Sequence, residues 1–111
     1  MRAVTSCRNV GRMLIIAGEF NVEPSDRDKF LAAAGPMMAE TMKEEGCHAY
    51  VFTPSTTDPA VIHLFEKWDD ESNLKPHFKS AHMSAFNAAL KEVKTNSRNI
   101  TMYTVASEKS L

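Results

Sequence analysis

The chain has almost no net charge, few cysteines and no long apolar run. It holds 13 Lys and Arg against 14 Asp and Glu in 111 residues, a net charge of −1. A nucleic-acid-binding domain carries a clustered basic excess, so we expect no nucleic-acid partner. No apolar run approaches the ~18 residues of a membrane-spanning helix, and residues 1–10 contain no apolar core of a secretory signal. The sequence therefore predicts neither a membrane segment nor secretion.

The two cysteines, Cys7 and Cys47, show no spacing typical of a metal or redox site. We therefore expect a reduced, cytoplasmic protein in which Cys47 is a buried and inert thiol. The remaining composition, 43% hydrophobic and 24% charged, is typical of one soluble globular domain. We predict a disordered extension over residues 1–12, the domain over residues 13–106 and a tail over residues 107–111.

The first half of the domain predicts a strand and a helix. The near-continuous apolar run of residues 13–22 is typical of a buried strand, in which Gly18 marks a bulge or a close approach of backbone. The apolar periodicity of residues 26–45 predicts an amphipathic helix with Ser25 as its N-cap. Pro36 falls inside this helix and removes a hydrogen bond from it, so we expect a kink or two shorter helices.

The second half predicts three further strands and a broken helical region. We expect strands at residues 47–53, 61–68 and 100–106, a helix break at Ser80, and a polar helix end at residues 94–98. The element order is therefore β-α-β-β-α-β. It matches the α+β ferredoxin-like split β-α-β sandwich, a four-stranded antiparallel sheet with helices on one face.

Three of these strands are apolar on both faces, although the helices can cover only one. Monomers rarely expose an apolar face of this size, so we predict a homodimer with the two sheets packed face to face. His48, Tyr50 and Phe52 share one face of their strand, which we assign to dimer packing rather than catalysis. We also expect His63 and Phe65 to meet the partner sheet.

Residues 61–86 hold three of the four histidines and the only tryptophan. Alternation along the strand places Glu66 on the same side as Leu64 and Trp68. A buried carboxylate is costly unless it is paired, so a structural hydrogen bond or ion pair is favoured over catalysis for Glu66. Trp68 fits a core residue and a stacking platform for a ligand equally well.

His77 and His82 are the candidate general bases, because an unperturbed imidazole has a pKa near ~6.5. On one ideal helix they would be separated by ~140°, so both can face one pocket only because the chain breaks near Ser80. The alternative is a surface-exposed His77 and a hydrogen-bonded His82 at a helix start. His63, His77 and His82 lack the spacing of helical metal ligands, and no carboxylate or cysteine completes a set, so we expect no metal.

The element order and two segments resemble the antibiotic biosynthesis monooxygenase (ABM) family, most closely its bacterial quinol monooxygenase branch. The segments are KEEGCHAY (residues 43–50) and FEKWDDESNLKPHFKSAHMSAF (residues 65–86). That branch has a Glu-Glu-Gly-Cys turn, a Glu-x-Trp at the end of strand three and two histidines at a five-residue interval. The resemblance implies a dimeric α+β barrel that oxidises without flavin, haem or metal. It also implies a phenolic or quinol substrate whose anion reduces O₂ directly, although fold alone does not decide function.

Other branches of the family match less well. Haem-degrading members use asparagine, tryptophan and histidine at positions that hold Ala17, His77 and Phe86 here, so haem degradation is disfavoured. A polyketide-oxidising branch has asparagine where this chain has Leu64, while Trp68 matches that branch's pocket tryptophan. A third relative, an isomerase of a phosphorylated sugar, has a similar pair of histidines and stays open.

The sequence and the resemblance together predict a cytoplasmic, cofactor-independent monooxygenase that oxidises a small aromatic quinol or phenol with O₂. In this mechanism His77 or His82 takes the hydroxyl proton. The predicted substrate contacts come from the third strand and the last helix: Leu64, Glu66, Trp68, Met83 and Phe86. The isomerase alternative requires a cationic cluster, supplied by Lys75, Lys79 and Arg98. The other alternative is a non-catalytic module that binds a small molecule.

Overall fold

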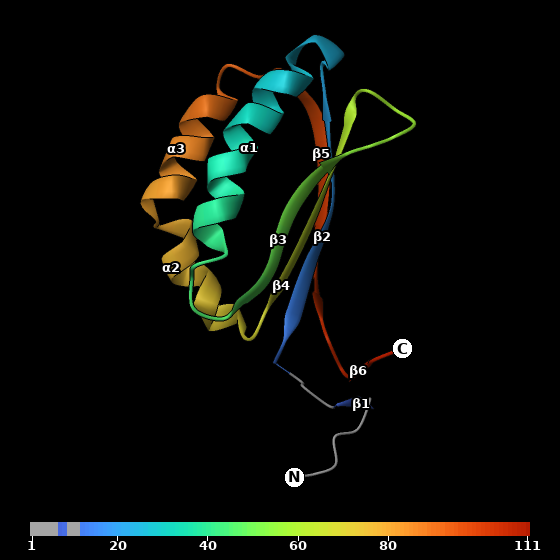
Figure 1. Cartoon of the computed structure of the whole chain (residues 1–111), viewed down its shortest axis with the longest axis vertical. Helices are drawn as coiled ribbons and strands as arrows, with labels where there is room; N and C mark the ends of the chain where they lie inside the picture. Colours follow the sequence, from blue (N-terminus) through green and yellow to red (C-terminus); the bar gives the residue numbers. More distant parts are fainter. Residues whose placement is uncertain (1–6, 9–11) are drawn as a thin grey trace.

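The computed structural model describes residues 7–8 and 12–111. The main strands are β2 (Leu14–Val22), β3 (Cys47–Pro54), β4 (Val61–Trp68) and β5 (Thr95–Thr104). The helices are α1 (Arg27–Thr41), α2 (Leu74–Phe78) and α3 (Ala81–Leu90), with 3₁₀ turns η1 (Pro24–Asp26) and η2 (Glu71–Asn73). The strands form one antiparallel sheet in the order β3-β4-β2-β5, and the helices lie on one face of it (Figure 1). The predicted α+β ferredoxin-like fold is confirmed.

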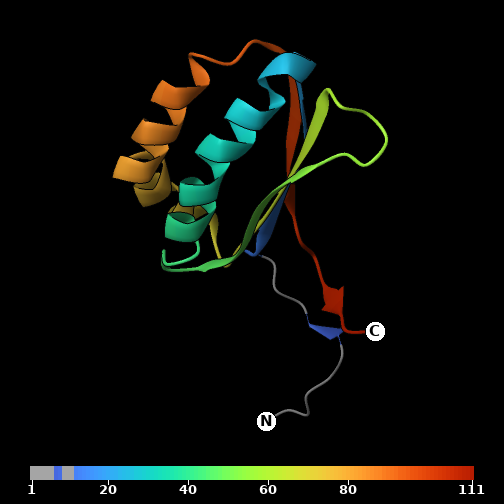
Figure 2. The same cartoon turned by 45° about the horizontal axis from the view of Figure 1, so that its top comes forward.

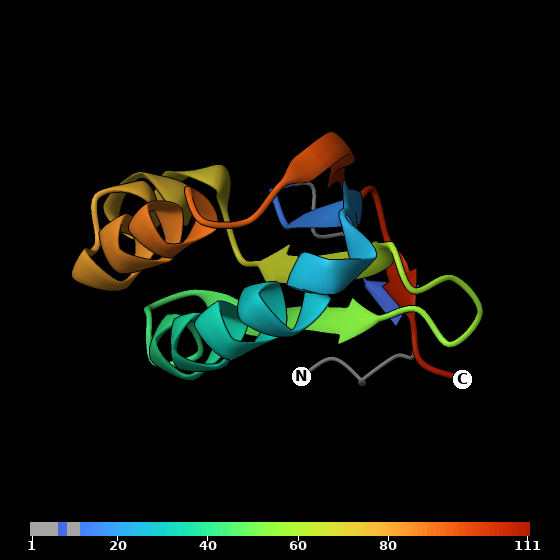
Figure 3. The ribbon, with the colours of Figure 1, turned by 90° about the horizontal axis from the view of Figure 1, so that it is seen from above.

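The core lies between the sheet and the helices. Four phenylalanine rings occupy its centre, with centroids 5.2 to 5.9 Å apart: Phe20, Phe30, Phe52 and Phe86. Two come from strands and two from helices, so this cluster joins the two layers. Tilted and edge-to-face aromatic pairs add to the stabilisation from burial. Figures 2 and 3 show that α1 and α3 run beside each other over this face and leave the opposite face of the sheet uncovered.

Helix α1 differs from the prediction at both ends. Ser25 is not its N-cap, because the chain first forms η1 and the helix starts at Arg27. The predicted alternative of two shorter helices is wrong, since α1 continues through Pro36 as one helix. Pro36 and Ala32 are both exposed, so water can bond the Ala32 carbonyl that proline leaves without a partner.

Helix α1 ends at Thr41, four residues before the predicted end, and a turn leads into β3. Gly46 closes this turn with a φ of 82°, a conformation that strongly favours glycine. A Cβ at Gly46 would also lie 2.3 Å from Asn73 Oδ1. The turn is therefore specified by a glycine, and it fixes where Glu44 and Glu45 lie.

The last strand is longer than predicted. The polar residues 95–99 belong to β5 and not to the end of a helix, because α3 already stops at Leu90. β5 is an edge strand, so polar side chains can face water while its backbone pairs with β2. Gly18 permits this pairing, since a Cβ there would lie 2.0 Å from the Asn99 carbonyl oxygen. The predicted close approach at Gly18 is confirmed.

The two faces of β3 are the reverse of the prediction. Tyr50 and Phe52 do share a face, but it is buried under the helices, with exposed fractions of 4% and 5%. Alternation alone could not assign the faces, because both are apolar. The neighbouring His48 is exposed, next to an irregularity in the pairing of β3 with β4.

The uncovered face of the sheet carries apolar side chains, as expected. Val51 pairs with Phe65, and Phe65 with Ala17, across three adjacent strands. Val51 and Phe65 are each 42% exposed, and Tyr103 on β5 is 53% exposed. This patch is the surface that the predicted homodimer would cover.

The ends of the described chain meet in a small second sheet. β1 (Cys7–Arg8) pairs antiparallel with β6 (Glu108–Lys109), and Lys67 Nζ lies 2.8 Å from Glu108 Oε1. Residues 1–6 and 9–11 of the predicted disordered extension lie outside the described residues. Within residues 7–8 and 12–111, no helix is long and apolar enough to cross a membrane.

Candidate active site

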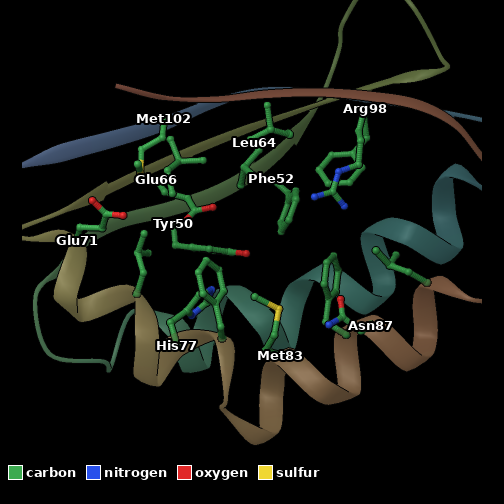
Figure 4. Close-up of a pocket in the computed structure, with 17 residues that line it drawn as sticks. Tyr50, Phe52, Leu64, Glu66, Glu71, His77, Met83, Asn87, Arg98 and Met102 are labelled. Carbon is green, nitrogen blue, oxygen red and sulfur yellow. The ribbon is translucent and has the colours of Figure 1, made fainter. Parts of the chain in front are cut away.

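A cavity of about 700 Å³ lies between the sheet and helices α2 and α3 (Figure 4). Its walls are mostly apolar, from Ile16, Phe20, Phe52, Leu64, Leu74, Phe78, Met83, Phe86, Leu90, Ile100 and Met102. The polar lining residues are Tyr50, Glu66, Glu71, His77, Asn87 and Arg98. A few polar groups converging on an apolar cavity are typical of a small-molecule site.

Glu66 reaches the cavity because β4 alternates, as predicted, with Leu64 and Glu66 on the helix-facing side. Glu66 is 6% exposed, and its Oε1 accepts a hydrogen bond from Trp68 Nε1 at 2.8 Å. Trp68 is fully buried and lies outside the cavity lining. This bond is the structural role expected for Glu66, and it leaves the other carboxyl oxygen without a hydrogen bond among the described residues.

Burial controls the protonation of the groups around Glu66. It raises the pKa of Glu66 from 4.5 to about 7, while the Trp68 hydrogen bond lowers it and the charge of Glu44 raises it. Burial, followed by the charge of Glu66, also raises the pKa of Tyr50 far above its usual value. Tyr50 is therefore neutral at physiological pH, whereas Glu66 exchanges a proton there.

His77 is almost fully buried, and a carboxylate from another part of the chain holds it. Glu44 Oε2 lies 2.8 Å from His77 Nδ1 and 2.5 Å from His82 Nε2. A carboxylate only accepts hydrogen bonds, so both imidazole nitrogens carry the donated protons. Ser80 separates the two histidines and caps α3 by accepting from Met83 N, which allows both rings to reach Glu44.

Aromatic rings fix the orientation of His77. Its ring centroid lies 5.1 Å from that of Trp68, 5.4 Å from that of Tyr50 and 5.6 Å from that of Phe78. No described residue hydrogen-bonds the second nitrogen, Nε2. With its proton on Nδ1, the imidazole keeps the lone pair of Nε2 for a molecule in the cavity.

Glu44, His77 and His82 also form the kind of cluster that can hold a metal, with ligand atoms within 4.8 Å of one another. The expectation that no carboxylate would join the histidines is therefore wrong. The separations of 2.5 and 2.8 Å nevertheless match direct hydrogen bonds. Two ligands of one tetrahedral ion, each ~2.0–2.1 Å from the metal, would be about 3.3 Å apart. In the arrangement described, Glu44 joins the two histidines through direct contacts.

The structure brings together most of the predicted site residues. The predicted residues that line the cavity are Leu64, Glu66, His77, Met83 and Phe86. Trp68 and His82 do not line it. Trp68 donates a hydrogen bond to Glu66, which lines the cavity, and His82 contacts Glu44, the carboxylate that also holds His77. Lys75 and Lys79 are exposed and are not part of the lining, so the cationic cluster of the isomerase alternative does not form.

Sequence reasoning missed five polar residues of the site, one of which is Glu71. Tyr50 was assigned to the other face of the sheet, and Glu44 to the interior of a helix. Arg98 was considered only as part of a phosphate cluster, and Asn87 was not considered. The Glu-Glu-Gly-Cys segment was the available signal for Glu44, since Gly46 marks the turn that directs this carboxylate towards the histidines.

The fold and the site define the protein as a small α+β protein with an apolar cavity between a four-stranded sheet and its helices. The family model of antibiotic biosynthesis monooxygenases matches residues 13–89, and the chain belongs to this family. It is 30% identical over 81 residues to the Bacillus subtilis protein named "Putative monooxygenase YcnE", covering 73% of this chain and 85% of that protein. It is 27% identical over 89 residues to "Probable quinol monooxygenase YgiN" of Escherichia coli, covering 71% and 86%.

The fold is also similar to that of solved structures from this family. A solved structure described as "Putative antibiotic biosynthesis monooxygenase from Nitrosomonas europaea" superimposes with a TM-score of 0.79. The match covers 86% of this chain and 91% of that chain at 18% identity. This likeness shows the fold, while the family and its named relatives support a general monooxygenase-type function.

Proposed function

We propose that the protein is a cofactor-independent monooxygenase that oxidises a small aromatic quinol or phenol with O₂. The observation that carries the proposal is the hydrogen bonding of His77 at the edge of the cavity. Its Nδ1–H is held by Glu44, and its Nε2 is left as an acceptor beside an apolar cavity. A general base with an oriented tautomer, placed where a hydroxyl group can bind, is what deprotonation of a phenol requires.

In the proposed reaction His77 Nε2 takes the hydroxyl proton, and Glu44 stabilises the imidazolium that forms. The substrate anion passes one electron to O₂, giving an aryloxyl radical and superoxide. These recombine at a ring carbon, the imidazolium returns its proton to the peroxide, and loss of water leaves the quinone. Both oxygen atoms of O₂ are accounted for, one in the product and one in water. No outside reductant is required.

The other groups of the cavity have supporting roles. Glu66 sits on the sheet side and, when protonated, can donate a hydrogen bond to a second substrate oxygen. Apolar walls such as Leu64, Met83 and Phe86 exclude water from the anion, which favours transfer of its electron. His82 contacts Glu44 and acts as a positioning residue for this carboxylate.

The test is oxygen consumption by the purified protein with simple quinols and phenols. We expect uptake by the wild type, and a loss of roughly 10²-fold or more in His77→Gln, because a positioned general base contributes about 10²–10⁴-fold. His48→Gln is the matched control, since His48 is exposed and outside the cavity. Absence of uptake by the wild type, or equal rates for His77→Gln, would contradict the proposal.

A cytoplasmic homodimer remains part of the proposal. The exposed patch of Val51, Phe65 and Tyr103 is a suitable contact surface for a second sheet. Sedimentation at micromolar concentration should give a dimer for the wild type and a monomer for Phe65→Lys. A folded wild-type monomer would rule out this assembly.

A further inference from the structure

The cavity is chemically different at its two ends. His77, Glu66 and Tyr50 converge at one end, while Arg98 and Asn87 project from β5 and α3 at the other (Figure 4). Arg98 is the only lysine or arginine in the described lining. A substrate that spans the cavity therefore meets proton-transfer groups at one end and a fixed positive charge at the other.

Arg98 is held over the cavity by an aromatic ring. Its Cζ lies 5.5 Å from the centroid of the Phe20 ring, within the range of a cation–π contact. Phe20 is itself buried and belongs to the central phenylalanine cluster. The guanidinium plane is therefore supported by a rigid part of the core, and its N–H groups stay available.

No carboxylate of the described chain pairs with Arg98. The two acidic residues of the lining, Glu66 and Glu71, lie towards the opposite end in Figure 4. The guanidinium is always charged and presents two parallel N–H donors that match a carboxylate. An unpaired arginine that lines a cavity is a group for which a ligand can supply the partner.

We infer that the substrate is a hydroxyarene that carries a carboxylate at the end remote from its reacting hydroxyl, and that Arg98 binds this carboxylate. Asn87 lines the same end of the cavity from α3 and offers an amide donor there. One guanidinium and one amide suit a singly charged carboxylate better than a phosphate, which proteins hold with several donors or cations. The inference rests on the proposed function for the position of the hydroxyl group at His77.

The cavity volume is consistent with this class of ligand. A space of about 700 Å³ is within the range of sites that hold drug-sized molecules. A two-ring compound fits within this volume with space to spare. Arg98 is exposed to solvent, so it should contribute selectivity more than affinity, and this selectivity should weaken with added salt.

The experiment compares two ligands of equal size, 6-hydroxy-2-naphthoate and 6-hydroxy-2-naphthamide, whose hydroxyl and acyl groups lie at opposite ends of two rings. Their binding to the full chain is measured by naphthol fluorescence under nitrogen, because the proposed reaction would consume both compounds in air. We expect the wild type to bind the carboxylate roughly tenfold more tightly than the amide, as for a hydrogen bond to a charged group. Arg98→Met should bind the two equally, Arg98→Lys should keep part of the preference, and Lys91→Met, outside the lining, should keep all of it.

Equal affinities in the wild type, a preserved preference in Arg98→Met, or no binding of either compound would each overturn the inference. Thermal melting checks that Arg98→Met is folded, which is expected because the side chain lies on an exposed edge strand. The outcome is separate from the oxygen-uptake test. A preference for the carboxylate without any oxygen uptake would reject the monooxygenase and retain the binding site.

Discussion

Two histidine–carboxylate pairs in this molecule have similar short contacts and different surroundings. His77 Nδ1 lies 2.8 Å from Glu44, and His48 Nε2 lies 2.5 Å from Asp69. The His77 side chain is 1% exposed and that of Glu44 16%, whereas His48 and Asp69 are 49% and 57% exposed. Water screens the exposed pair, so its contribution to stability is small, while the buried carboxylate strongly orients and polarises its imidazole.

The comparison teaches that proximity of the two groups does not by itself make a reactive site. The buried pair borders a cavity and is backed by three aromatic rings. The exposed pair does not line this cavity and can exchange its contact for water. The following substitutions separate the two situations, from the largest expected effect to the smallest.

Glu44→Gln should have the largest effect. The amide keeps the size of the side chain but removes the charge that stabilises the His77 imidazolium. We expect kcat for quinol oxidation to fall by roughly 10–10²-fold with KM little changed, which is less than the about 10²–10⁴-fold that a general base itself contributes. Asp69→Asn, the equivalent change in the exposed pair, should leave kcat within about twofold. Equal losses in both variants would show that burial is not the deciding factor.

Glu66→Gln should change how stability depends on pH. The folded state raises the pKa of Glu66 from 4.5 to about 7, so it binds the proton more tightly than the unfolded chain. The resulting stabilisation is complete below pH 4.5 and is lost as the pH rises to about 7. We expect the wild type to lose roughly 2–3 kcal/mol relative to Glu66→Gln between about pH 4.5 and pH 8.

Urea denaturation at the two pH values measures this difference. Glutamine can still accept the hydrogen bond from Trp68, so packing around residue 66 should persist. Parallel stability curves for the wild type and Glu66→Gln would mean that folding does not raise the pKa of Glu66.

His82→Gln should have a smaller effect on the reaction. Glutamine can donate an N–H to Glu44, and His82 does not line the cavity. We expect kcat to change by less than about fivefold, against the larger loss for His77→Gln. Steady-state oxygen uptake distinguishes the two. A loss in His82→Gln as large as that in His77→Gln would make His82 the proton acceptor.

Asp69→Asn should have the smallest effect on stability. Exposed ion pairs contribute little, so the free energy of unfolding should change by less than about 1 kcal/mol. Chemical denaturation at neutral pH provides the value. A larger destabilisation would show that the His48–Asp69 contact is structural, for example by holding the irregular start of β3 against the end of β4.

The buried face of β4, from which Leu64 and Glu66 line the cavity, could be predicted from sequence. Ile62, Leu64, Glu66 and Trp68 alternate along β4, and their burial follows directly from the two-residue period of a strand. The helix break at Ser80 was also predictable, since serine is a good N-cap and Met83 N is its partner. These are local properties, set by residues a few positions apart.

The sequence by itself thus determined the element order, the buried face of β4 and the presence of two histidines beside it. Tertiary structure alone decided that Glu44, 33 residues before His77, becomes their common partner. It also decided that Tyr50 faces the cavity and that Arg98 closes its far end. The physical reason is that the repeat of a strand or helix specifies which side chains share a face. Contacts between distant segments depend instead on how the sheet and the helices pack against each other.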